Sequence, residues 1–154
     1  MNHIRINKKG RCYMELGLTG KVAVITGGSD GIGKAAAISL STEGAKVAIV
    51  GRSQEKLDSA VVEIQGLTGG EVIGVSADVS LESEVKDMIE NVVLQFGQLD
   101  VLVNNAGTSS ATTLEEMINN DLEIDFGIKV YGAIYCARAA LPYLKASGSG
   151  VILN

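Results

Sequence analysis

A loop with three glycines between a strand and a helix is the strongest constraint on how this chain can fold. Residues 21–26 form an apolar strand-like run, Gly27, Gly31 and Gly33 follow, and an alanine-rich helical segment covers residues 34–40. Glycine permits a sharp turn and lets backbone N–H groups approach an anion, while the following helix directs its unpaired N–H groups to the same point. The pattern predicts a phosphate-binding turn built mainly from backbone.

Glycine spacing alone is also typical of an ordinary strand-to-helix turn that only needs positive φ angles. A second apolar strand over residues 46–51 would end near the adenosine ribose of a bound dinucleotide. This context favours the nucleotide-binding interpretation.

Short apolar runs alternate with segments of helical periodicity along the chain. In residues 81–96, for example, Val85, Met88, Ile89 and Val92 share one helical face. The alternation predicts an α/β fold, a Rossmann-type doubly wound parallel sheet with five strands in the order 3-2-1-4-5. The strands are expected at residues 22–26, 47–50, 71–76, 99–104 and 151–153.

We expect residues 14–154 to form one dinucleotide-binding domain and residues 1–13 to be a basic, unstructured tail. The tail carries four basic residues and no acid, so the rest of the chain has 9 basic and 18 acidic residues. An acidic body argues against nucleic acid as a partner. Charges interrupt every long apolar run, so the sequence predicts no membrane span.

The cysteine and histidine content limits the chemistry. Two cysteines, Cys12 and Cys136, do not make a disulfide framework, which fits a reducing cytoplasm, and Cys136 is expected to be a buried, unreactive thiol. His3 is the only histidine and lies in the tail. We therefore expect neither a histidine-based triad nor a metal site.

Three motifs in register resemble those of the short-chain dehydrogenases/reductases, over residues 18–154. They are Thr26-Gly-Gly-Ser-Asp-Gly-Ile-Gly33, Asp78-Val79 and Asn104-Asn105-Ala106-Gly107. A simple strand-ending turn is the alternative interpretation of the two asparagines. The resemblance implies that the pyrophosphate is bound by Gly27, Ser29, Gly31, Ile32 and Gly33. It also implies that Asp78 and Val79 contact the adenine, and that Asn105, Ala106 and Gly107 lie beside the adenosine ribose.

The cofactor expected from the second strand is NADP(H). NAD-preferring sites place an acid at the end of this strand for the ribose hydroxyls, whereas this chain has Gly51-Arg52-Ser53, and Arg52 can bind a 2′-phosphate. Asp30 opposes this assignment, because it stands where NADP-preferring members of the family often carry a basic residue, and its charge would repel a nearby phosphate. NAD is therefore the alternative.

The family's chemistry is hydride transfer between the nicotinamide and a small carbonyl or alcohol substrate, with catalytic Ser, Tyr and Lys residues. Here no tyrosine is followed four positions later by lysine; the residues at that spacing are Gly17, Tyr135, Ala139 and Ser147. Residues 150–154 resemble the fifth strand, after which the catalytic residues would come. We therefore expect a chain truncated at its carboxyl end, with an incomplete sheet edge and no catalytic residue of its own.

The remaining expectations concern the whole protein and one unusual residue. The resemblance implies a homo-oligomer for the full-length enzyme. Lys129 stands where the family commonly has an asparagine that helps to position the catalytic lysine. Two alternatives to an oxidoreductase remain open: a non-catalytic dinucleotide-binding or interaction module, and an inactive fragment of a split gene.

Overall fold

The main element of the fold is a five-stranded parallel sheet in the spatial order β5-β4-β3-β6-β7. The computed structural model describes residues 4–6, 12–14, 16–108, 113 and 115–154. The strands are β3 (Val22–Thr26), β4 (Lys46–Gly51), β5 (Val72–Ser76), β6 (Val101–Val103) and β7 (Val151–Leu153). Taken in chain order this is 3-2-1-4-5, which confirms the predicted Rossmann-type sheet.

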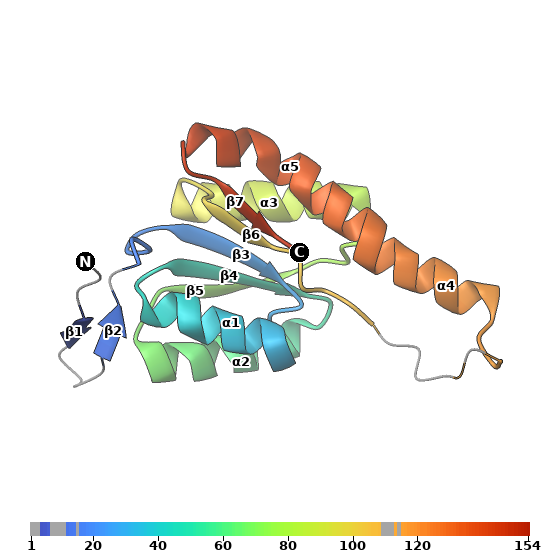
Figure 1. Cartoon of the computed structure of the whole chain (residues 1–154), viewed down its shortest axis with the longest axis horizontal. Coiled ribbons are helices and arrows are strands. Elements are labelled where there is room, and N and C mark those ends of the chain that lie inside the picture. Colours follow the sequence, from blue (N-terminus) through green and yellow to red (C-terminus); the bar gives the residue numbers. More distant parts are fainter. Residues whose placement is uncertain (1–3, 7–11, 15, 109–112, 114) are drawn as a thin grey trace.

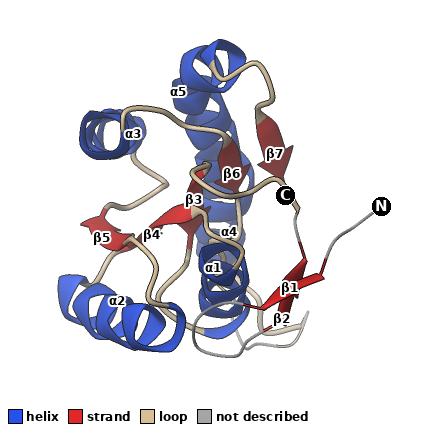
Figure 2. Cartoon of the chain, turned by 90° about the vertical axis from the view of Figure 1, so that its left-hand side faces the viewer, coloured by secondary structure: helices blue, strands red, loops and turns tan. Residues whose placement is uncertain are grey.

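Helices cover both faces of the sheet (Figure 2). Helices α1 (Gly31–Thr42) and α2 (Gln54–Thr68) lie on one face, and α3 (Glu82–Phe96) and α5 (Ala133–Ala146) lie on the other. Because the inner strands are covered twice, β3 is buried along its whole length. This explains why the strand sequences are continuous apolar runs instead of alternating ones.

Each face of the sheet has its own apolar cluster. On the side of α1 and α2, the cluster includes Ile25, Val47, Ile49, Leu57 and Ile64. On the side of α3 and α5, it includes Val24, Val50, Met88, Ile89 and Leu102. Residues 24 and 25, and likewise 49 and 50, point to opposite faces, as the period of a strand requires.

A continuous helix runs from α4 (Asn119–Phe126) through a π-helical segment, η1 (Gly127–Gly132), into α5 (Figure 1). Segments of π-helix are rare in proteins. Those that do occur inside α-helices often lie at functional sites. Helix α5 contacts β6 and α3, whereas α4 extends beyond the sheet. The segment η1 therefore lies where the helix leaves the core.

The amino-terminal segment, which we expect from the sequence to be a tail, contains two short strands. Strands β1 (Ile4–Ile6) and β2 (Cys12–Met14) pair antiparallel, with Ile4 opposite Met14, in a separate two-stranded sheet. Backbone pairing between these two short segments gives them regular structure that the basic composition did not suggest. The domain boundary at residue 14 stays a prediction.

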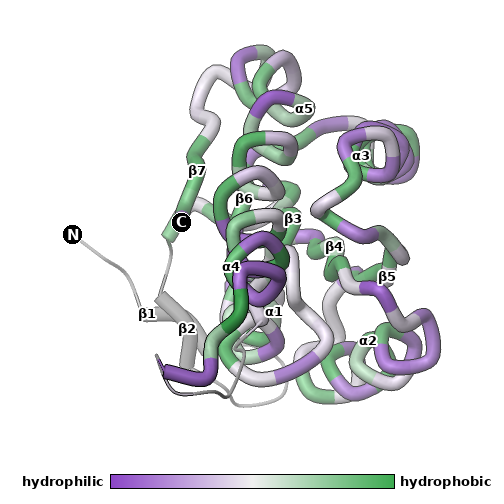
Figure 3. Tube along the Cα trace, turned by 90° about the vertical axis from the view of Figure 1, so that its right-hand side faces the viewer, coloured by the Kyte–Doolittle hydropathy of each residue, from purple (hydrophilic) through white to green (hydrophobic). Residues whose placement is uncertain are grey.

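Strand β7 lies at one edge of the main sheet and pairs with β6. Its side chains are 45%, 37% and 52% exposed, in chain order. Figure 3 shows that this edge is hydrophobic. Exposed apolar edge strands in general present unpaired backbone groups to which another strand can pair.

The described residues contain neither a candidate membrane span nor a candidate metal site. Over the described ranges, no helix combines the length and apolar character needed to cross a bilayer. Among these same residues, no group of histidine, cysteine and carboxylate side chains is arranged to hold a metal ion.

Asp100 connects three strands at the amino-terminal end of the sheet. Its carboxylate is 2% exposed and accepts hydrogen bonds from Lys21 Nζ at 2.8 Å, Val22 N at 2.9 Å and Gln98 Nε2 at 2.7 Å. The backbone carbonyl of Asp100 accepts from Val151 N at 2.9 Å. Burial raises the pKa of Asp100, but these hydrogen bonds and the charge of Lys21 outweigh burial and hold it below its ordinary value.

We predict that Asp100→Asn lowers the free energy of unfolding by about 2 kcal/mol at pH 7, because its amide cannot satisfy three donors as the carboxylate does. A carboxylate with a lowered pKa in the folded state stabilises above the unfolded pKa of about 3.9, and this contribution is lost as the pH falls through the folded pKa. The difference between wild type and variant should therefore shrink below about pH 4.

Urea unfolding at pH 7, 4 and 2.5 tests this prediction. Asp87→Asn, at an exposed position on α3, is the matched control and should change stability by less than about 0.5 kcal/mol. A loss for Asp100→Asn that is the same at pH 7 and pH 2.5 would contradict the prediction.

Candidate functional site

A cavity of about 380 Å³ opens at the carboxyl ends of β3, β4, β5 and β6. This is the point where the strand order reverses, at which ligands bind in open α/β sheets. Segments from the ends of these strands and from η1 form its wall. The lining residues are Gly27, Ser29, Val50, Gly51, Arg52, Ser53, Lys56, Ala77, Asp78, Val79, Ala106, Gly107, Thr108 and Ile128.

Close packing inside the glycine loop brings backbone to the edge of this cavity. A Cβ on Gly33 would overlap the carbonyl oxygen of Gly27 and would stand 2.5 Å from Asn105 Nδ2. Gly31 has a φ of +53°, and a Cβ there would meet nothing within 4 Å. Gly33 therefore packs the loop, while Gly31 leaves open space above the start of α1, as a backbone cradle for an anion requires.

The side chains of Thr26 and Asn105 join the glycine loop to the turn after β6. Thr26 Oγ1 accepts hydrogen bonds from Asn105 N and Ala106 N, both at 3.0 Å, and donates to Val103 O at 3.3 Å. Asn105 Nδ2 donates to Thr26 O at 3.0 Å and Gly27 O at 3.1 Å. Asn105 thus holds the glycine loop through two backbone carbonyls without lining the cavity, whereas Ala106 and Gly107 do line it.

Asp30 caps helix α1. Its Oδ1 accepts a hydrogen bond from Gly31 N at 2.7 Å, with Asp30 in extended backbone conformation. The side chain lines a neighbouring cavity between α1 and α2 instead of the 380 Å³ cavity. Its carboxylate therefore stabilises the helix start.

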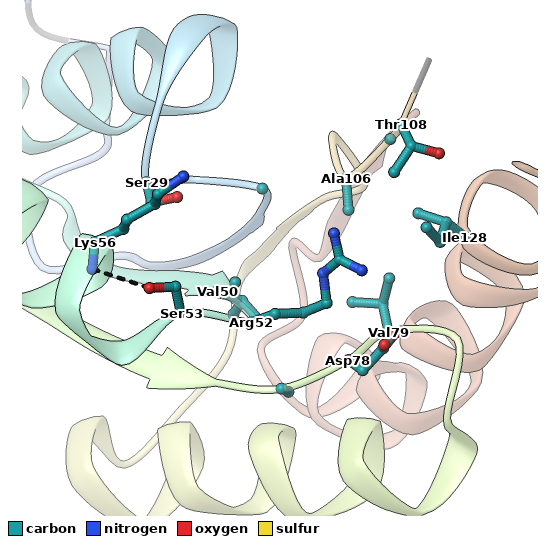
Figure 4. A pocket seen from close by; sticks show the side chains of 14 residues that line it. Ser29, Val50, Arg52, Ser53, Lys56, Asp78, Val79, Ala106, Thr108 and Ile128 are labelled. Carbon is teal, nitrogen blue, oxygen red and sulfur yellow. Dashed lines mark hydrogen bonds between the residues drawn. The ribbon is translucent and has the colours of Figure 1, made fainter. Parts of the chain in front are cut away.

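Among the described residues, Arg52 is one of two cationic residues that line the 380 Å³ cavity, with Lys56. In Figure 4 its guanidinium crosses the cavity toward Ala106. Ser53 follows as the cap of α2, its Oγ accepting from Lys56 N at 3.4 Å. The end of β4 thus carries a cation, Arg52, and a hydroxyl group, Ser53. In NAD-preferring sites an acidic residue at this place accepts hydrogen bonds from the ribose.

Asp78 and Val79 form the opposite wall. Asp78 Oδ1 accepts from Ser80 N at 2.9 Å and Ser80 Oγ at 2.7 Å. Burial raises the pKa of Asp78, but the Ser80 hydrogen bonds and the charge of Arg52 outweigh burial and lower it overall. Asp78 is therefore a fixed acceptor beside Arg52.

A hydrogen-bonded network connects the cavity wall with the π-helical segment. Thr108 Oγ1 donates to Asp125 Oδ1 at 2.7 Å, and Lys129 Nζ donates to Asp125 Oδ2 at 2.9 Å. The hydrogen bond from Thr108, followed by that from Lys129, lowers the pKa of Asp125. Lys129 is thus held in an ion pair and not presented as a free amine.

The structure brings only part of the predicted site together around the cavity. Seven of the twelve predicted residues line it: Gly27, Ser29, Arg52, Asp78, Val79, Ala106 and Gly107. Asp30, Gly31, Ile32, Gly33 and Asn105 do not line it; the Ile32 side chain is 82% exposed at the start of α1.

Sequence reasoning missed Ser53, Lys56, Thr108 and Ile128 among the lining residues. Ser53 had a usable signal, because serine before a helical run is typical of an N-cap. Ile128 had none, since its approach to the cavity depends on how a distant helix packs on the sheet. Lys56 lies three residues beyond the cap and looks like any exposed helical lysine.

Other chemically reactive side chains lie away from the cavity. Burial raises the pKa of the Cys136 thiol to about 12, so this cysteine is unreactive as predicted. Tyr135 and Tyr143 line a groove between α3 and α5, and Tyr131 stacks on Tyr135 with ring centroids 6.4 Å apart. In the described part of the chain, no tyrosine lines the cavity.

Comparisons with known proteins agree with this arrangement. The model of the short chain dehydrogenase family matches residues 21–154. An uncharacterized oxidoreductase of Staphylococcus epidermidis is 37% identical over 134 residues, which cover 87% of this chain and 56% of the relative.

Solved structures are also similar. An L-sorbose reductase from Gluconobacter frateurii, complexed with NADPH and L-sorbose, matches with a TM-score of 0.84 and 38% identity over 90% of this chain and 53% of that one. An alcohol dehydrogenase from the archaeon Thermococcus sibiricus, complexed with 5-hydroxy-NADP, matches with a TM-score of 0.80 and 35% identity over 86% of this chain and 56% of that one. The chain thus spans little more than half of the length of each of these proteins.

We predict that Thr26→Val destabilises the chain by about 2 kcal/mol or more, because it leaves the N–H groups of Asn105 and Ala106 without their acceptor. Thr26→Ser retains the hydroxyl and should lose only about 1 kcal/mol, for one buried methyl group. Thermal and urea unfolding of both variants measure the difference. Equal stability of the two would show that the hydroxyl does not hold the loop.

Proposed function

Because this chain belongs to the short-chain dehydrogenase/reductase family, we propose that it binds NADP(H) in the cavity at the carboxyl ends of β3 to β6. The whole protein would be an oxidoreductase that transfers hydride between NADP(H) and a small carbonyl or alcohol substrate. The observation that carries the proposal is the cavity itself, with backbone on one side, Asp78 and Val79 on another, and Arg52 at the end of β4.

The residues present fit a nicotinamide dinucleotide. The glycine loop and the start of α1 would hold the pyrophosphate through backbone N–H groups, and Asp78 with Val79 would hold the adenine. Ala106 and Gly107 would lie beside the adenosine ribose, held in place by Asn105 and Thr26. When bound, the nicotinamide supplies hydride transfer, and the chain's own residues supply binding and orientation.

Arg52 supports NADP(H) over NAD(H). It offers a permanent positive charge at the end of β4, and both structural neighbours described above were solved with NADP-type nucleotides. Asp30 weighs less against this assignment than its sequence position suggested, because its carboxylate is engaged by Gly31 N at the helix start. A hydrogen bond to a 2′-phosphate is charge-assisted and therefore stronger than one between neutral groups.

We further propose that residues 1–154 bind the dinucleotide without carrying out the reaction. No Tyr-x-x-x-Lys pair occurs in these residues, and Tyr135 and Tyr143 lie in the groove between α3 and α5. A phenol with a pKa near 10 needs a nearby cation to act as a base at neutral pH. A non-catalytic binding module is therefore the second candidate function for these residues.

For the whole enzyme, we also propose that it forms a homo-oligomer and is located in the cytoplasm.

We predict that the purified chain binds NADPH saturably at one site and does not oxidise it in the presence of small aldehydes or ketones. Nucleotide fluorescence measures binding, and absorbance at 340 nm measures oxidation. Turnover would contradict the proposed absence of catalytic residues. Failure of the folded chain to bind NADPH or NADH would contradict the proposed cofactor site.

We predict that Arg52→Gln weakens NADPH binding about tenfold and leaves NADH binding within about twofold, since only NADPH carries the 2′-phosphate. Arg138→Gln is the matched control. Arg138 forms an ion pair with Glu82 at 2.8 Å, and neither residue lines the cavity. Titration of each variant with both nucleotides gives the dissociation constants. Equal weakening for both nucleotides would show that Arg52 does not select the 2′-phosphate.

A further inference from the structure

Two cavities meet at the start of helix α2. The 380 Å³ cavity shares Ser29, Ser53 and Lys56 with a second cavity of about 390 Å³ between the beginnings of α1 and α2. Lys56 is exposed and lies in the first turn of α2. These three residues form the boundary between the two cavities.

The positive charges around this boundary differ in what they contact. Lys34, in the second cavity, is paired with Glu63 at 3.0 Å. Arg52 extends into the first cavity toward Ala106, away from Ser53 (Figure 4). Lys56 extends toward Ser29 in the same view, and within the described ranges its ammonium group forms no ion pair.

The negative charges nearby are mostly engaged. Asp30 accepts from Gly31 N at 2.7 Å, and Glu63 is paired with Lys34. Glu55 is the third carboxylate of the second cavity and lies on the exposed first turn of α2. A ligand anion at the boundary would therefore meet the unpaired ammonium group of Lys56. Two of the three nearby carboxylates, those of Asp30 and Glu63, are already engaged by other groups.

Two hydroxyl groups complete the boundary. A Cβ on Gly51 would stand 3.6 Å from Ser29 Oγ, so this hydroxyl lies over the end of β4. Ser53 Oγ accepts from Lys56 N, which leaves its own hydrogen available to donate. A cation beside two hydroxyl donors is a suitable set for a phosphate monoester.

We propose that Lys56, together with Ser29 and Ser53, binds the 2′-phosphate of NADP(H) and is a specificity-determining residue of this chain. The inference rests on the proposed function and adds to it a residue outside all of the motifs. Arg52 alone does not define the subsite, because its guanidinium lies across the space that an adenosine on Asp78 and Val79 would need, and so must turn aside when the nucleotide binds. Lys56 needs no such movement away from the adenosine space.

The test compares Lys56→Gln with Lys86→Gln, which removes the same charge from α3 on the opposite face of the sheet. Dissociation constants for NADPH, NADH and 2′,5′-ADP are measured by titration of the full chain. We expect Lys56→Gln to weaken NADPH and 2′,5′-ADP about tenfold and NADH by less than about twofold. Lys86→Gln should leave all three unchanged.

The outcomes separate this inference from the proposed function. If wild type binds both dinucleotides and Lys56→Gln leaves the NADPH to NADH preference unchanged, the inference is wrong and the proposed function stands. Equal weakening of NADPH and NADH would also overturn it, since Lys56 would then act on a group common to both. If wild type binds neither dinucleotide, the proposed function fails and this inference fails with it.

Discussion

The structure depends on the contact between two strand-ending turns at the centre of the sheet. The turn after β3 must leave the strand sharply to form the glycine loop, and the turn after β6 must pass directly beside it. Thr26 and Asn105 satisfy the backbone groups that these turns leave unpaired, so the two loops are fixed relative to each other. The cavity lies where it does because these two neighbouring strands turn to opposite sides of the sheet.

Charge is distributed differently at the two ends of the same sheet. At the amino-terminal end, Asp100 is buried and surrounded by donors, so its charge is neutralised inside the structure. At the carboxyl end, Arg52 and Lys56 are exposed and Asp30 is used to cap a helix. An acidic chain thereby retains a locally positive rim at the cavity, which a net charge of −5 does not reveal.

The sequence predicted the parts of the fold and site that depend on local patterns. Strand runs and turn glycines follow from residues that are close together in the chain. The alternation of strands and helices along the chain predicted the order of the sheet, and the structure confirms it. Ile128 was not predicted, because it reaches the cavity only after a helix distant in sequence has packed on the sheet. Lys56 was not predicted, because an exposed lysine in the first turn of a helix carries no distinctive signal. The π-helical form of η1 was also not foreseen, since Gly127-Ile-Lys-Val-Tyr-Gly132 has no distinctive composition.

The π-helical segment sets the rotational phase between α4 and α5. In an α-helix each residue advances by about 100°, and a segment with i→i+5 hydrogen bonds holds more residues per turn, so the faces before and after it are offset. Cys136, Ala140 and Leu144 pack into the core while Asp125 contacts Thr108, and η1 lies between these two sets. The length of this helix therefore matters to the site: one residue removed from η1 would rotate Asp125 away from Thr108 without altering either side chain.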